Sequence, residues 1–146
     1  IKKQQEALKT KSFKALKGQL PWPADGRIIA KFGRQWNSKL KTTTENPGID
    51  IKGQPGSPIR TVLGGVVTTI TYIRGYGTTI IVDHGGGFYT VYSHVTNIQT
   101  VVDGQVRNGD IIAYMGDSGS INGSKLHFEI WGKGQKLDPE KWLIKK

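Results

Sequence analysis

Glycine-separated runs of β-branched and aromatic residues fill the middle of this chain and restrict it to a β-rich fold. Valine, isoleucine, threonine and tyrosine favour strands, and glycine adopts the backbone conformations of tight turns. The 20 glycines follow no Gly-x-y period, which excludes a collagen-like helix. We expect antiparallel strands joined by hairpins. The expected strands cover residues 59–62, 66–73, 78–84 and 88–95, and the expected turns are Gly64-Gly65, Gly75-Tyr76-Gly77 and Gly85-Gly86-Gly87.

The N-terminal part of the chain predicts a helix followed by strands. Residues 1–17 are largely good helix formers, with a thin apolar stripe opposite a charged face. Gly18 and the prolines after it end this segment. We therefore expect residues 1–19 to form a short N-terminal α-helix, the end of a longer coiled coil. Strands are expected over residues 27–32 and 48–51, with residues 34–47 as a polar loop between them.

The C-terminal part predicts further strands and a closing helical turn. Apolar residues alternate with polar or amphipathic ones between Leu126 and Trp131, the pattern of a strand with two distinct faces. A turn and a strand precede it at 105–115, followed by a Gly-Ser loop over 116–124. Residues 138–143 are expected to form a helical turn. We assign residues 20–146 to one mainly β domain with a single core.

Composition excludes several classes of protein. The chain has no cysteine, which rules out disulfide scaffolds, cysteine zinc fingers and cysteine nucleophiles. No apolar run approaches the ~20 residues of a membrane helix, so we expect membrane association only through parts outside this chain. Of the net charge of +10, +5 lies in residues 1–20 and +3 in residues 131–146. This distribution argues against nucleic-acid binding; it fits a solvated basic tail, or attraction to an anionic cell-wall polymer or membrane surface.

Any histidine-based site must come from three residues, His84, His94 and His127. His127 shares a strand face with Lys125 and Glu129 and follows a flexible loop, a suitable place for a ligand or a base. His94 lies at the end of an expected strand. The strand would hold its side chain rigidly, and the loop that follows would leave it accessible to a ligand. His84 stands at the mouth of a glycine turn, where we expect a turn-stabilising hydrogen bond.

Asp50 lies two residues after Gly48 on the rim of an expected strand. A carboxylate in this position suits a metal ligand. It suits a loop-capping hydrogen bond equally well, and spacing alone leaves both roles open.

Seven short segments resemble, in the same order, the motifs of the LytM-type, lysostaphin-like zinc metallopeptidases. The resemblance extends from about residue 20 to residue 143. It implies a lysostaphin-like antiparallel β-sheet groove of the β-roll or barrel-sandwich kind. The segments span residues 47–51, 64–67, 75–77, 82–85, 89–94, 106–110 and 126–130.

Active members of that family hold zinc with the His and Asp of a His-x-Gly-x-Asp motif and the second His of a His-x-His motif. The resemblance puts Asp50 and His127 at ligand positions and His94 at a catalytic position. Asn46 stands where a third ligand is expected, and Lys125 where a second catalytic histidine is expected. An amide oxygen is a weak zinc ligand, and an ammonium cannot act as a base. We therefore expect no zinc cofactor and no catalysis, with these five residues as vestiges of the site.

The position of Lys125 leads to a further hypothesis. Its ammonium would repel a dication at close range, and it could instead pair with Asp50 near the metal position. The alternative is that Lys125 points to solvent.

Residues 20–23, residues 139–143 and the preceding helix resemble the degenerate EnvC-like activators of cell-wall amidases. The resemblance implies a non-catalytic activator of an N-acetylmuramoyl-L-alanine amidase in cell-wall remodelling or cell separation, in the periplasm or otherwise outside the cytoplasm. The groove with Asn46, Asp50, His94, Lys125 and His127 would then bind the amidase, with peptidoglycan as a second candidate partner. Two alternatives remain open: an active zinc endopeptidase with an altered metal set of Asp50, His94 and His127, and a plain peptidoglycan-binding module.

Overall fold

Antiparallel sheets make up most of the protein. The computed structural model describes residues 13–117, 120 and 123–146, so the first twelve residues of the expected N-terminal helix lie outside the described residues. The described elements include one short helix, α2, Pro139–Trp142. The strands are β1 Arg27–Ala30, β2 Gly33–Asn37, β3 Thr42–Asn46, β4 Ile49–Lys52, β5 Pro58–Arg60, β6 Gly65–Ile73, β7 Gly77–Gly85, β8 Phe88–Ser93, β9 Val95–Thr96, β10 Gln105–Val106, β11 Ile111–Met115, β12 Lys125–Gly132 and β13 Gln135–Leu137.

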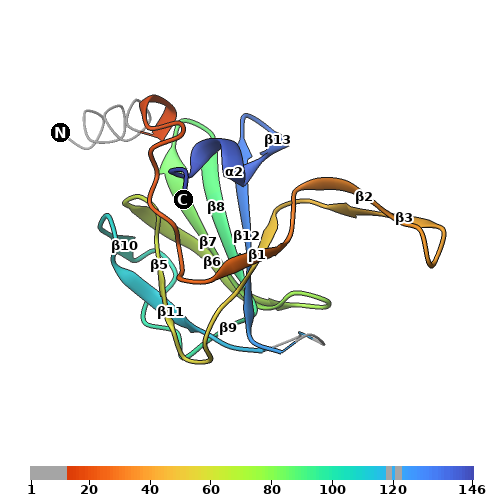
Figure 1. Ribbon diagram of the computed structural model, residues 1–146. Helices are drawn as coiled ribbons and strands as arrows, with labels where there is room; N and C mark the ends of the chain where they lie inside the picture. Colours follow the sequence, from red (N-terminus) through yellow and green to blue (C-terminus); the bar gives the residue numbers. More distant parts are fainter. Residues whose placement is uncertain (1–12, 118–119, 121–122) are drawn as a thin grey trace.

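The strands form three sheets (Figure 1). The largest has the order β1-β4-β12-β8-β7-β6-β10, and β13 also pairs with β12. A second sheet has the order β5-β11-β9, and β2 and β3 pair with each other as a third. The prediction of a mainly β, antiparallel architecture is confirmed; the sheets formed by the described strands do not close into a barrel.

The core lies between the two larger sheets, whose buried side chains form one cluster. Strand β12 shows how the sequence pattern produces this packing. Leu126, Phe128 and Ile130 are fully buried on its core side, whereas His127 and Glu129 on its other side are nearly buried among polar groups. The alternation predicted for residues 126–131 is therefore confirmed, and the strand contributes to the core and to the groove at once.

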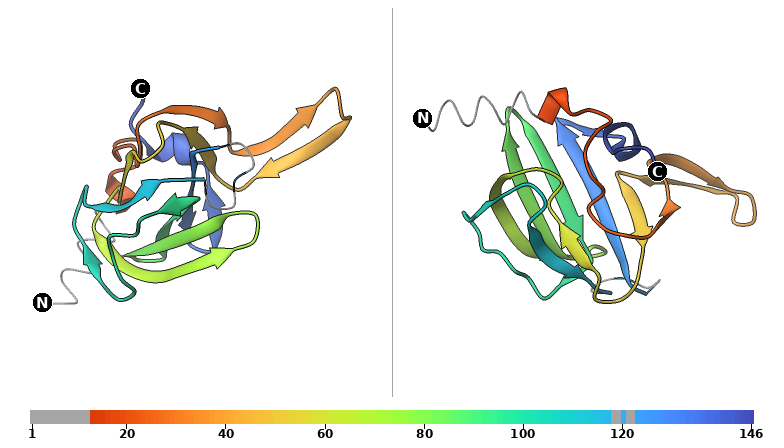
Figure 2. Two further views of the ribbon diagram at one scale, coloured as in Figure 1. Left: turned by 90° about the horizontal axis from the view of Figure 1, so that it is seen from below. Right: turned by 60° about the vertical axis from the view of Figure 1, so that its left-hand side comes forward.

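Residues 34–47, expected to be a loop, instead form most of a hairpin. Strands β2 and β3 pair in register from Gly33↔Asn46 to Asn37↔Thr42. The Asn37 Oδ1 atom accepts hydrogen bonds from the backbone N–H groups of Lys39 and Leu40, at 3.0 and 3.1 Å, and so fixes the turn. We call β2 and β3 with their turn the arm; it extends away from the body of the protein in all views (Figures 1 and 2).

The polar composition of the arm explains why the sequence did not reveal it. None of the residues of β2 and β3 belongs to the buried core, so neither face needs apolar side chains and no alternating pattern arises. The strand predicted over residues 27–32 ends at Ala30 for a related reason, because the chain turns into the arm through Gly33, whose φ is +99°.

The segment before residue 20 packs on the domain. Phe13 is fully buried, with ring centroids 4.8 Å from Phe88, 5.0 Å from His84 and 5.3 Å from Trp142. Residues 13–15 are helical, and Gly18 ends the turn with a φ of +82°.

The helical turn predicted for residues 138–143 is confirmed as α2. The Asp138 side chain caps it by accepting a hydrogen bond from the Glu140 N–H, and Pro139 occupies its first turn. Within the described residues, no helix has the length and apolar content needed to span a membrane.

Candidate functional site

A polar groove of about 400 Å³ opens between the base of the arm and the β6–β7 turn. All five residues predicted to line a groove meet there, although they come from distant parts of the chain. They are Asn46, Asp50, His94, Lys125 and His127. The remaining lining residues are Ala30, Lys31, Gln35, Thr44, Glu45, Pro47, Gly75 and Tyr76.

Strand pairing brings the groove floor together. On β12, His127 lies directly opposite Asp50 of β4 and opposite Ser93 of β8. Lys125 lies two residues earlier on β12, on the same side of the sheet as His127. Because side chains of directly opposed residues project from the same face, the groups on β4 and β12 converge.

Lys125 forms an ion pair with Asp50. Its Nζ atom donates to Asp50 Oδ2 at 3.0 Å, and the two side chains are only 11% and 14% exposed. The hypothesis that Lys125 pairs with Asp50 is confirmed, and the alternative of a lysine pointing to solvent is wrong.

His127 is held between two carboxylates. Its Nδ1 atom lies 2.6 Å from Asp50 Oδ1 and its Nε2 atom 2.8 Å from Glu129 Oε2. Each nitrogen faces a carboxylate oxygen, an arrangement that favours the doubly protonated ring. Burial lowers the pKa of His127, but the hydrogen bonds and charges of Asp50 and Glu129 outweigh it and raise the pKa above its usual value.

The two carboxylates respond in the opposite direction. Burial raises the pKa of Asp50, but His127 and Lys125 more than compensate, so that the pKa lies below its usual value. The pKa of Glu129 is lowered in the same way, by His127 and by the Trp131 indole N–H, which donates to Glu129 Oε1 at 2.7 Å. We call Lys125, Asp50, His127 and Glu129 the ion-pair network.

Glu129 and Tyr76 are site residues that sequence reasoning did not assign. Glu129 could have been found, since it lies two residues after His127 and so on the same strand face. Tyr76 comes from the β6–β7 turn and covers His127 with a ring-centroid distance of 4.9 Å. Burial, followed by the charges of Glu129 and Asp50, raises the pKa of Tyr76. Nothing in the local sequence pattern indicated that this turn reaches the groove.

Asn46 makes a local contact. Its Oδ1 atom accepts a hydrogen bond from the Gly48 N–H at 3.2 Å. The loop-capping role that the sequence left open for Asp50 therefore belongs to Asn46, whereas Asp50 is engaged by Lys125 and His127.

His94 lies between β8 and β9 at the side of the groove. It is 3% exposed and has a φ of +64°, a conformation that is uncommon for residues other than glycine. Its backbone N–H donates to the Tyr76 carbonyl at 2.8 Å, and its ring lies 6.4 Å from that of Tyr76. The β6–β7 turn thus fixes His94 beside the groove.

His84 lies outside the groove, in the core. Its ring nitrogens lie 2.9 Å from the Gly64 carbonyl and 2.7 Å from Thr90 Oγ1. The expected hydrogen bond within the glycine turn is made by its neighbour, because Asp83 Oδ1 accepts the Gly85 N–H at 2.8 Å. His84 is structural, as expected. Its hydrogen bonds do not lie within the glycine turn; they join β7 to Gly64, just before β6, and to Thr90 of β8.

The polar groups on the groove floor are engaged with one another. In the part of the chain that the structure describes, no three His, Asp or Glu side chains are grouped to hold a metal ion. An ammonium at Lys125 has no lone pair to offer a metal, and both nitrogens of His127 lie within hydrogen-bond distance of carboxylate oxygens.

The comparison with protein families identifies residues 44–139 as matching the model of peptidase family M23. Over 92% of this chain, the murein hydrolase activator EnvC of Escherichia coli is 31% identical. The DD-carboxypeptidase/endopeptidase Mpg of Neisseria meningitidis is 33% identical over 77% of this chain. The chain spans about a third or less of the length of these curated relatives, 31% and 26% respectively.

A solved structure confirms the fold. A zinc-containing peptidase from Vibrio cholerae superposes with a TM-score of 0.77 over 88% of this chain and 41% of its own. Its sequence identity of 22% supports similarity of fold alone. The relatives thus include proteins named as activators and proteins named as peptidases, and the chemistry of the groove must distinguish them.

Proposed function

The chain belongs to peptidase family M23, and we propose that it is a non-catalytic activator of a cell-wall amidase, an N-acetylmuramoyl-L-alanine amidase. The groove lined by Asn46, Asp50, His94, Lys125 and His127 is its partner-binding surface. This role is consistent with the name of the EnvC relative, a murein hydrolase activator.

The observation that carries this proposal is the ion-pair network. Catalytic zinc sites need three protein ligands and a bound water. Here one Asp50 oxygen accepts from Lys125 and the other from His127, whose second nitrogen faces Glu129. Asn46 Oδ1 is engaged with Gly48. The residues at the expected ligand positions therefore do not fit a zinc ion, and an ammonium in their midst opposes a dication.

The alternative of an active endopeptidase requires the ion-pair network to be dismantled. Asp50 would have to exchange Lys125 for the metal, and His127 would have to give up a contact with Asp50 or Glu129 to coordinate it. The activator proposal requires no such rearrangement, because a partner can contact the groove as it stands.

The compartment follows from the proposed substrate of the partner. Murein is the peptidoglycan of the bacterial cell wall, so an activator of murein hydrolysis acts outside the cytoplasm, in the periplasm or an equivalent compartment. The complete absence of cysteine suits an oxidising compartment.

The test is release of soluble fragments from labelled peptidoglycan. The domain alone, with and without added zinc, is expected to release none. Addition of the domain to a cell-wall amidase from the same cell is expected to raise the amidase rate in a saturable way. A matched control is Lys133→Glu, which changes an exposed lysine beyond the far end of β12 and leaves the groove unchanged.

Two results would contradict the proposal. Zinc-dependent hydrolysis by the domain alone would identify it as an endopeptidase. Binding to peptidoglycan without any effect on an amidase of the same cell would identify it as a cell-wall binding module.

A further inference from the structure

A row of basic side chains crosses three neighbouring strands beside the groove. In the large sheet, Arg27 of β1 lies directly opposite Lys52 of β4, and Lys52 lies directly opposite Lys125 of β12. Directly opposed residues of antiparallel strands project from the same face, and like charges in this arrangement repel. The row therefore costs stability, which indicates that it serves another purpose.

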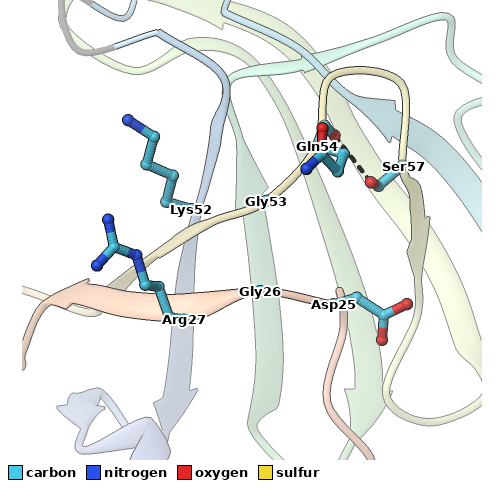
Figure 3. A pocket seen from close by; sticks show the side chains of 7 residues that line it. All are labelled: Asp25, Gly26, Arg27, Lys52, Gly53, Gln54 and Ser57. Carbon is cyan, nitrogen blue, oxygen red and sulfur yellow. Dashed lines mark hydrogen bonds between the residues drawn. The ribbon is translucent and has the colours of Figure 1, made fainter.

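Lys125 is neutralised within the protein, whereas its neighbours are not. Lys125 pairs with Asp50. Among the residues that the structure describes, neither Arg27 nor Lys52 forms a salt bridge, and both are exposed. Figure 3 shows the two basic side chains extending to the same side of β1 and β4, while Asp25 extends the other way.

Arg27 and Lys52 line an open pocket of about 530 Å³, together with Asp25, whose side chain extends away from the two cations. Two glycines, which have no side chain, allow the two backbone segments that border this pocket to approach closely. A side chain at Gly26 would collide with the Lys52 carbonyl, and one at Gly53 would collide with the Asp25 carbonyl. This close backbone approach places Arg27 and Lys52 side by side on neighbouring strands.

The chemistry of this pair suits an oxyanion. A guanidinium offers a planar fork of donors, and an ammonium adds a compact charge with three more. Both match a carboxylate, and such charge-assisted hydrogen bonds are about twice as strong as neutral ones. The pair is open to solvent, so a single small anion would be held weakly and a ligand must be anchored elsewhere as well.

The adjacent groove supplies that anchor. Lys52 follows Asp50 by two residues on the same face of β4, about 7 Å further along the strand. The charges on the groove floor are paired with each other in the ion-pair network. A segment lying in the groove would therefore pass from a neutralised floor to the free cations of Arg27 and Lys52.

We propose that Arg27 and Lys52 form a carboxylate-binding site for an acidic residue of the amidase segment that occupies the groove. This inference rests on the proposed function, and it adds the charge of the partner and the two residues that recognise it. The partner segment carries its acidic side chain at the end that leaves the groove over β4 and β1.

The test compares two double charge reversals in the intact protein. Arg27→Glu with Lys52→Glu removes the site, and Lys14→Glu with Lys133→Glu changes the net charge equally at exposed positions outside the groove lining. Affinity for the cell-wall amidase is measured at low and high salt. We expect the first variant to bind about tenfold more weakly than wild type at low salt and to lose most of its salt dependence. The control variant should bind within about twofold of wild type.

A single variant separates recognition from folding. Arg27→Glu places an acid directly opposite Lys52, so the melting temperature should rise by about 1–3 °C while amidase affinity falls. A purely structural role for Arg27 would not move stability and affinity in opposite directions.

Three outcomes of these binding measurements would contradict the proposal, and each identifies a different error. Equal amidase binding by wild type and the Arg27→Glu, Lys52→Glu variant would overturn the carboxylate site and leave the activator role intact. Failure of wild type to bind any amidase would overturn the proposed function and this site with it. If affinity for soluble peptidoglycan stem peptides falls in the variant while amidase affinity does not, the ligand is the cell wall and the proposal is wrong.

Discussion

Lys125 places its ammonium 3.0 Å from Asp50 in a part of the groove where both side chains are largely buried. Neither charge is well solvated there, so each depends on the other. The same carboxylate also accepts from His127, which in turn faces Glu129. Removing one member of the ion-pair network therefore leaves an uncompensated charge, and the cost should exceed that of losing a surface salt bridge.

Replacing Lys125 by methionine keeps the side-chain length and removes the charge. We expect Lys125→Met to lower the free energy of unfolding by about 2 kcal/mol, because Asp50 loses a buried partner. Urea denaturation followed by tryptophan fluorescence measures this. Lys133→Met, at an exposed position, should stay within about 0.5 kcal/mol of wild type. A loss for Lys125→Met no larger than for this control would show that the ion pair contributes little.

The pKa directions predict how the ion-pair network responds to pH. The pKa of His127 is raised, so its contribution is complete below the ordinary histidine value of 6.5 and is lost as pH rises through the folded value. The pKa values of Asp50 and Glu129 are lowered, so their contributions are complete above their ordinary values of 3.8 and 4.5 and are lost as pH falls. The network should therefore stabilise most between about pH 4.5 and pH 6.5.

The comparison of wild type with His127→Gln isolates this effect. The difference in free energy of unfolding between the two proteins should shrink as pH rises above about 6.5, in chelator-treated buffer. Urea denaturation across the pH range gives the values. A difference that stays constant or grows from pH 6 to pH 9 would mean that His127 is neutral in the folded protein.

At the scale of elements, the arm forms one wall of the groove and contributes nothing to the core. Gln35 and Thr44, opposite each other at its base, line the groove, whereas Trp36 and Leu40 further out are 65% and 70% exposed. Polar residues on both faces gave no alternating pattern, which is why the sequence predicted a loop. The arm could not be predicted because neither face of its strands packs against the core, so no alternation of apolar and polar residues is required.

Shortening the arm should leave folding intact. Replacing residues 36–43 by Asn-Gly joins Gln35 to Thr44 through a two-residue turn and retains the groove lining. Because no core residue is removed, the free energy of unfolding should change by about 0.5 kcal/mol or less. Thermal denaturation followed by circular dichroism measures this. A large loss of stability would contradict the description of the arm as independent of the core.

Unlike the arm, the segment at residues 13–16 contributes a side chain to the core. Phe13 is fully buried among Phe88, His84 and Trp142, in the segment that the sequence assigned to an N-terminal helix without indicating whether it docks on the domain. Its single aromatic side chain, set among lysines, carried no periodic signal strong enough to predict docking. The contact is long-range, and local sequence patterns do not encode it.

Truncating Phe13 tests this docking. We expect Phe13→Ala to destabilise the protein by about 3–5 kcal/mol, as for other buried aromatic side chains. Lys14→Ala, one residue away and exposed, is the matched control and should have little effect. Equal stability of both variants in urea denaturation would show that residues before 20 lie outside the core.

At the scale of the whole molecule, the strands that pack on a core were predictable from local patterns, whereas the groove residues were predictable only through their match to family motifs. Glycine turns and alternating apolar residues located β6, β7, β8 and β12. The five groove residues were predicted from their motif positions, and the Lys125–Asp50 pair from charge. Tyr76 was missed because its role arises from a tertiary contact with His127, whereas Glu129 lies two residues after His127 on the same strand and could have been assigned from that spacing.

The groove of a metallopeptidase fold is retained, and its expected ligand positions are engaged in internal ion pairs and hydrogen bonds. The proposed role as an activator depends on this exchange of a metal ion for an ammonium. If that proposal holds, Lys125 balances the Asp50 carboxylate that a metal ion would otherwise have balanced.

The most direct test of this exchange is the zinc content of untagged protein after incubation with equimolar zinc and gel filtration. Wild type should retain no more zinc than the Asp50→Asn variant, which lacks the central carboxylate. Retention of one zinc per chain by wild type, and its loss in Asp50→Asn, would show that the groove is a metal centre.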